Sequence, residues 1–60
     1  MDKAGPNYWV SAGDSASSRW TIELVGRPER YRLIDMHAKL SSRNRVRYFD
    51  TFEQAVAVTR

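Results

Sequence analysis

The chain has 60 residues and a mass of 7.0 kDa, the size of one small domain with a marginal hydrophobic core. It contains no cysteine and only one histidine, His37, which excludes disulfides, thiol catalysis and histidine-based metal clusters. Hydrophobic residues make up 42% and charged residues 28% of the chain, close to ordinary globular usage, so global disorder is not expected. We therefore expect residues 1–60 to form a single domain that packing or self-association stabilises.

The N-terminal residues carry little structural signal. Residues 1–6 lack the charged and apolar regions of a signal peptide, and no apolar run approaches the roughly 18 residues of a membrane span. We expect these residues to be a flexible N-terminus. The protein is expected to be cytoplasmic and to have no metal, no cofactor and no contact with a membrane.

Basic charge is concentrated in the middle of the chain. The formal net charge is +3, and residues 27–47 hold seven basic side chains against only Glu29 and Asp35. Eight of the ten basic residues are arginine, which can contact a phosphate, a carboxylate or a base edge through two hydrogen bonds. This distribution favours a negatively charged partner.

Turn-forming residues divide the chain into extended segments. Such turns are predicted at residues 13–18, 26–29 and 41–44. Strands are predicted over residues 7–12, 19–25, 31–37 and 44–48. The clearest is 19–25, because Trp20, Ile22 and Leu24 alternate with polar side chains. In the segment 31–37 the pattern leaves open which side chains face the core.

Residues 50–60 are predicted to form a C-terminal helix. Either Asp50 with Glu53 or Thr51 with Gln54 satisfies the capping-box pattern that begins a helix. The apolar face of this helix consists of Phe52, Ala55, Val56 and Thr59. The predicted fold class is therefore α+β, a small antiparallel sheet of three to four strands packed on one C-terminal helix (β-β-β-β-α).

One short helix covers only one face of such a sheet. By alternation, we expect the covered face to carry Trp20, Ile22, Leu24, Val46 and Tyr48. The opposite face then presents Arg19, Thr21, Glu23, Arg45 and Arg47, with Arg32 beside them. The orientation of Trp9 stays open, because either Trp9 or the pair Tyr8 and Val10 points outward.

An open sheet face with arginines and an aromatic ring suits nucleic acid. Arginine neutralises phosphates and reaches base edges, and an aromatic ring packs on a sugar or a base. The residues predicted to bind nucleic acid, DNA rather than RNA, are Arg19, Arg32, Arg43, Arg45, Arg47 and Trp9. The same pattern is typical of a solvated outer face and of a protein interface, so these interpretations remain open.

Residues 47–55, with the sequence RYFDTFEQA, resemble the strand-to-helix junction of AP2-type DNA-binding domains and of phage-integrase arm-binding domains. Residues 19–23 are similar to the tryptophan-containing middle strand of those domains. The resemblance implies a three-stranded antiparallel sheet that reads DNA, with a helix packed behind it. Residues 31–37 depart from the pattern, because those domains usually have a short turn there. Small phage-encoded inhibitors share the sheet and capped helix, which gives the alternative of a protein-interaction module or inhibitor from a mobile element.

An enzyme is not expected. His37 and Asp35 are the only pair suited to acid–base chemistry near neutral pH, and no phosphate loop, metal-ligand spacing or catalytic triad is present in the sequence.

The chain also has more large apolar residues than one helix on one sheet can bury. Those predicted to be left over are Val25, Leu40, Phe49, Val58 and either Trp9 or the pair Tyr8 and Val10. We therefore predict a twofold homodimer.

Overall fold

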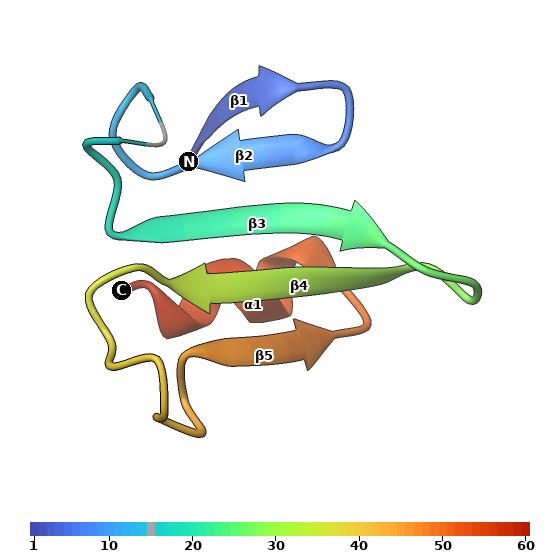
Figure 1. Cartoon of the computed structure of the whole chain (residues 1–60). Coiled ribbons are helices and arrows are strands. Elements are labelled where there is room, and N and C mark those ends of the chain that lie inside the picture. Colours follow the sequence, from blue (N-terminus) through green and yellow to red (C-terminus); the bar gives the residue numbers. More distant parts are fainter. Residues whose placement is uncertain (15) are drawn as a thin grey trace.

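Over residues 1–14 and 16–60, the part of the chain that the computed structural model describes, the protein forms a five-stranded antiparallel sheet followed by one helix (Figure 1). The elements are β1 (Asp2–Gly5), β2 (Tyr8–Val10), β3 (Trp20–Val25), β4 (Arg30–Asp35), β5 (Val46–Phe49) and α1 (Phe52–Val58). The strands lie side by side in chain order, and α1 packs on β4 and β5. The predicted α+β class is confirmed. Ser15, in the predicted turn 13–18, lies outside the described residues.

The sheet has one strand more than predicted. Asp2–Gly5 pairs antiparallel with β2, although the sequence suggests a flexible N-terminus over residues 1–6. Three of its four residues are exposed, and its pairing is interrupted by a register shift between Lys3 and Gly5. A strand of this kind has no apolar alternation from which it can be recognised.

The β3–β4 hairpin is the longest pairing in the sheet. Its register is unbroken from Trp20 opposite Asp35 to Val25 opposite Arg30. The turn that follows β3 contains Gly26, whose φ of 82° is a conformation that side chains with a Cβ rarely adopt. The predicted break at residues 26–29 is thus confirmed as a hairpin turn.

The hydrophobic core lies between the sheet and the helix. Ile22, Leu33 and Ala55 are buried at its centre. The side chains packed around them are Trp9, Trp20, Tyr31, Phe49, Phe52, Val56 and Val58. The inward orientation predicted for β3 is confirmed, and β4, whose faces the sequence left ambiguous, turns Tyr31 and Leu33 toward the helix.

The orientation predicted for β5 is wrong. Arg47 lies opposite Leu33 in the register with β4, so Arg47 and Phe49 are on the helix side of the sheet. Val46 and Tyr48 lie on the outer face, where they are 38% and 53% exposed. Alternation groups the residues of a strand into two sets, but it does not decide which set faces the core when both contain apolar residues.

Trp9 also faces the helix. Its ring centroid lies 4.9 Å from that of Phe52 and 6.0 Å from that of Tyr31. The choice that the sequence left open is therefore resolved with Tyr8 and Val10 on the opposite face of the sheet, where Val10 is fully buried. Trp9 cannot serve as an aromatic contact on an open sheet face, because it belongs to the core.

Thr51 is the residue that caps the helix. Its Oγ1 accepts a hydrogen bond from the backbone N–H of Gln54 at 3.2 Å, and Gln54 Oε1 accepts one from the backbone N–H of Thr51 at 3.3 Å. Of the two predicted capping boxes, the one at Thr51 is confirmed. Phe52, Ala55 and Val56 pack in the core as predicted, whereas Thr59 is the C-cap of the helix and its Oγ1 donates a hydrogen bond to the Val56 carbonyl oxygen. Val58 and Phe49, predicted to be left over, also pack against the core.

The helix is shorter than the strands it covers. Its seven residues span about 10 Å, whereas the six residues of β3 or β4 span about 20 Å. The helix therefore covers only part of this side of the sheet, where it packs on β4 and β5. Within the described residues, no helix is long and apolar enough to cross a membrane.

Candidate functional site

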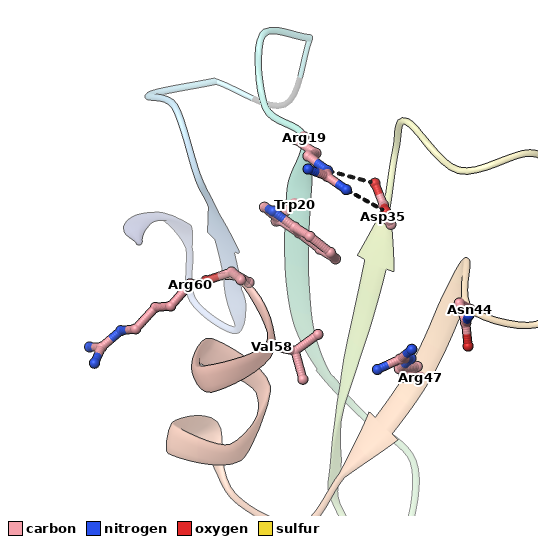
Figure 2. A pocket seen from close by; sticks show the side chains of 8 residues that line it. Arg19, Trp20, Asp35, Asn44, Arg47, Val58 and Arg60 are labelled. Atoms are coloured by element: carbon pink, nitrogen blue, oxygen red, sulfur yellow. Dashed lines mark hydrogen bonds and ion pairs between the residues drawn. The ribbon is translucent and has the colours of Figure 1, made fainter.

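A cleft of about 560 Å³ lies where α1 ends above the sheet (Figure 2). We name it the arginine cleft. It is lined by Arg19, Trp20, Asp35, Asn44, Arg47, Val58, Thr59 and Arg60. Trp20, Asp35 and Arg47 come from three neighbouring strands, and Val58 comes from the last turn of the helix. Val58 and the two residues that follow α1 form one wall of the cleft, and the start of β3, the end of β4 and the start of β5 form the other.

The antiparallel topology brings basic residues from distant parts of the sequence to this end. β3 begins, β4 ends and β5 begins here, and residues 36–45 connect β4 to β5 at the same end (Figure 1). We define the basic end by its six basic residues, Arg19, Lys39, Arg43, Arg45, Arg47 and Arg60. The positive charge of the chain thus gathers at one end of the sheet rather than on one face.

Arg19 is held in place by Asp35 and Trp20. Arg19 Nε and Nη2 donate hydrogen bonds to the two carboxylate oxygens of Asp35, each at 3.3 Å. The guanidinium carbon also lies 4.7 Å from the centroid of the Trp20 ring, in the position of a cation–π contact. The backbone N–H of His37 donates a further hydrogen bond to Asp35 at 3.0 Å. Arg19 is therefore positioned and largely neutralised within the cleft.

The same contacts set the charge of Asp35. The hydrogen bond from Arg19 holds the pKa of Asp35 below its usual value, helped by the backbone N–H of His37, while burial acts in the opposite direction. Asp35 is consequently a carboxylate at neutral pH. It is the one acidic residue among those that line the cleft.

Acid is expected to weaken the fold through Asp35. Because its pKa is lower in the folded than in the unfolded protein, where it is close to 3.8, the carboxylate stabilises the fold above that pH. This contribution is lost as the pH falls through the lowered value. Asp35→Asn should therefore have a lower urea midpoint than the parent protein at about pH 6, and the gap should shrink toward about pH 2. A gap that is independent of pH would contradict this assignment.

Several basic residues near the cleft keep an uncompensated charge. Arg45 Nη1 donates to the carbonyl oxygen of Ala38 at 2.9 Å, which fixes the connection between β4 and β5 but leaves the charge in place. No ion pair with a carboxylate is found for Arg43, Arg47 or Arg60 within residues 1–14 and 16–60. In Figure 2, Arg47 lies beside the cleft while the guanidinium of Arg60 points away from it. Arg47 is thus the arginine best placed to meet an anion inside the cleft.

The outer face of the sheet has a balanced charge. Arg32 pairs with Glu23 on the neighbouring strand, and Arg30 Nε lies 3.8 Å from Asp50 Oδ1. The arginine-rich sheet face that the sequence predicts therefore does not form. The prediction fails because it depends on the orientation of β5, which is inverted, and because the outward arginines have acidic neighbours across the strands.

The residues predicted to bind nucleic acid separate into two groups. Those that gather at the basic end are Arg19, Arg43, Arg45 and Arg47. Arg32 lies apart on the outer face, and Trp9 is packed under the helix. Asn44 and Arg60 line the cleft but were not predicted from the sequence. Asn44 precedes β5 and Arg60 follows α1, so only the topology of the sheet brings them to the cleft.

The side chains of the cleft suit an anionic ligand with an apolar part. Guanidinium and amide groups donate hydrogen bonds, and Trp20 and Val58 offer apolar surface. The described part of the chain holds no group of three or more His, Cys, Asp or Glu residues that could bind a metal ion. Comparison of the chain with protein-family models, with curated proteins and with solved structures gives no match.

Proposed function

We propose that the protein is a nonenzymatic module that binds nucleic acid by contacting phosphates with its basic end. The observation that carries the proposal is the gathering of six basic side chains at one end of the sheet, where Asp35 neutralises only Arg19. Contacts between phosphates and basic side chains supply most of the sequence-independent affinity of a protein for nucleic acid. Five of the six are arginine, which can hold a phosphate oxygen pair with two hydrogen bonds.

The spacing of the basic end fits a nucleic-acid strand. Arg19 precedes β3 and Arg47 lies on β5, two strands away, a separation of about 10 Å across the sheet. One strand of a nucleic acid offers a phosphate about every 3.4 Å along the helix axis. The same strand can therefore reach Arg19 while one of its phosphates contacts Arg47, which has no carboxylate partner in the described part of the chain. We propose DNA rather than RNA as the ligand, because residues 47–55 resemble part of AP2-type domains, which bind DNA.

Salt-dependent binding of DNA is the expected result. Fluorescence anisotropy of a labelled oligonucleotide should give a dissociation constant in the micromolar range at low salt, and the affinity should fall as salt is added. Arg43→Glu with Arg47→Glu should weaken binding by at least about 10-fold and should reduce the slope against salt by about one for each lost contact.

Arg27→Glu with Arg30→Glu is the matched control. It makes the same change of charge at the opposite end of the sheet, in and beside the β3–β4 turn. This control should retain most of the affinity. An equal loss for both variants would mean that only net charge matters, and an absence of binding at low salt would reject the proposal.

The outer face of the sheet, opposite α1, supports a second candidate function, which is protein interaction. Val46 and Tyr48 expose apolar surface there, and the Arg32–Glu23 pair leaves no net charge between β3 and β4 to oppose another copy. We propose a second copy of the chain as the partner, in a twofold dimer. The dimer would cover apolar surface that the single helix leaves open.

Sedimentation equilibrium tests this second candidate. The protein should show a mass near twice 7.0 kDa at high micromolar concentration. Tyr48→Lys should shift the equilibrium toward the monomer, whereas Leu40→Lys, at a side chain that is 85% exposed in the β4–β5 connection, should not. A 7.0 kDa species that persists at the highest concentration would contradict a dimer.

A further inference from the structure

We infer that the arginine cleft takes one unpaired nucleotide, so that the module prefers single-stranded nucleic acid to a duplex. This inference rests on the proposed function and adds to it the class of ligand and the place where it binds. It follows from the size of the cleft, from its lining and from the different states of its two arginines.

The size of the cleft suits a single nucleotide. Its volume of about 560 Å³ falls within the range of roughly 300–1,000 Å³ that is typical of small-molecule sites. The sheet bounds it on one side and the end of α1 on another (Figure 2). A base that is paired and stacked within a duplex cannot enter such a space, whereas an unpaired base can turn into it.

The lining of the cleft matches both parts of a nucleotide. Val58 and the part of Trp20 that lines the cleft offer apolar surface to a base, and Arg47 offers a guanidinium for a phosphate. In Figure 2, Val58 on the helix and Arg47 on β5 lie on opposite sides of the cleft. The amide of Asn44 stands at the rim, where it can form hydrogen bonds with the edge of a base. Inorganic phosphate would leave the apolar part uncovered, and a nucleoside would leave Arg47 without an anion.

Arg19 and Arg47 contact different parts of the nucleotide in this arrangement. Asp35 neutralises Arg19 and, with Trp20, holds its guanidinium in a fixed position. A guanidinium plane of this kind is a surface on which unpaired bases stack. Arg47 has no carboxylate partner in the described part of the chain, so it supplies the charge that the phosphate needs. The geometry therefore assigns the base to the side of Trp20 and Arg19 and the phosphate to Arg47.

Titration of the whole 15N-labelled chain with dAMP, deoxyadenosine and inorganic phosphate tests the inference by NMR. With dAMP, saturable shifts are expected at the Trp20 indole N–H and the Asn44 side-chain amide. Its affinity should exceed that of either deoxyadenosine or inorganic phosphate by at least about 5-fold. Arg47→Met should remove the advantage of dAMP over deoxyadenosine, and Arg30→Met, at the other end of β4, should leave it unchanged.

Oligonucleotide binding separates failure of this inference from failure of the proposed function. A single strand should bind at least about 5-fold more tightly than a duplex with the same number of phosphates. If both bind equally, or if dAMP shifts no signal of the cleft while DNA still binds, the cleft is not a nucleotide site but the basic end still binds phosphates. If no oligonucleotide binds at low salt, both proposals are rejected.

Discussion

Leu33→Ala is expected to leave a large part of the protein unfolded at room temperature. Leu33 is 1% exposed and lies at the centre of the core with Ile22 and Ala55. Removing a buried leucine side chain down to its Cβ costs about 2–5 kcal/mol, because apolar contacts are lost and a cavity remains. A domain of this size has a stability of roughly 3–5 kcal/mol, so little would be left. Urea unfolding followed by far-UV circular dichroism measures the loss.

Leu40→Ala is the matched control for this prediction. The chemical change is the same, but Leu40 is 85% exposed in the connection between β4 and β5. Its free energy of unfolding should stay within about 0.5 kcal/mol of that of the parent protein. Similar losses for the two variants would show that the core is not centred on Leu33.

The strongest local patterns of the sequence predict the architecture well. The alternation around Ile22 predicts β3 and its inward face, and the capping residues around Thr51 predict where α1 begins. Both signals depend on neighbours within one strand or one helical turn. Such local patterns predict the structure correctly here because the tertiary contacts favour the same strand and the same helix start.

The inverted orientation of β5 shows where local patterns fail. Its four residues place an apolar side chain on each face, with Val46 and Tyr48 on one and Phe49 on the other. Arg47 lies on the helix side without being buried, because it is on an edge strand and lines the open cleft at the end of α1. The packing of Phe49 against the core, rather than the pattern of β5 itself, therefore decides on which face this arginine lies.

The basic end could not be predicted for a related reason. Alternation along a strand assigns residues to faces, but the ends of strands become neighbours only through the order in which the strands pair. Arg19 and Arg47 are 28 positions apart in the sequence. The order β3-β4-β5 brings both to one cleft. The sequence alone identifies these arginines as candidate binding residues, but only the strand order shows that they lie at the same end of the sheet.

Trp9→Ala is expected to destabilise the protein by about 3–5 kcal/mol, comparable to its whole stability. The Trp9 ring contacts Phe52 and Tyr31, and the Phe52 and Tyr31 centroids are themselves 5.8 Å apart. These three rings join β2 and β4 to the first turn of α1. A helix of seven residues has little stability of its own, so the loss of this contact should release it from the sheet.

Trp9→Phe separates a core role of Trp9 from a role in binding. It keeps an aromatic ring against Phe52, so it should retain cooperative thermal unfolding and, at a temperature where it is folded, the DNA affinity of the parent protein. Trp9→Ala should lose binding only to the extent that it unfolds, which circular dichroism and anisotropy in the same buffer would show together. If Trp9→Ala instead melts like the parent protein but binds DNA more weakly, then Trp9 contacts the nucleic acid. The packing of Trp9 under α1 would then be wrong, and the site would extend from the basic end toward β2.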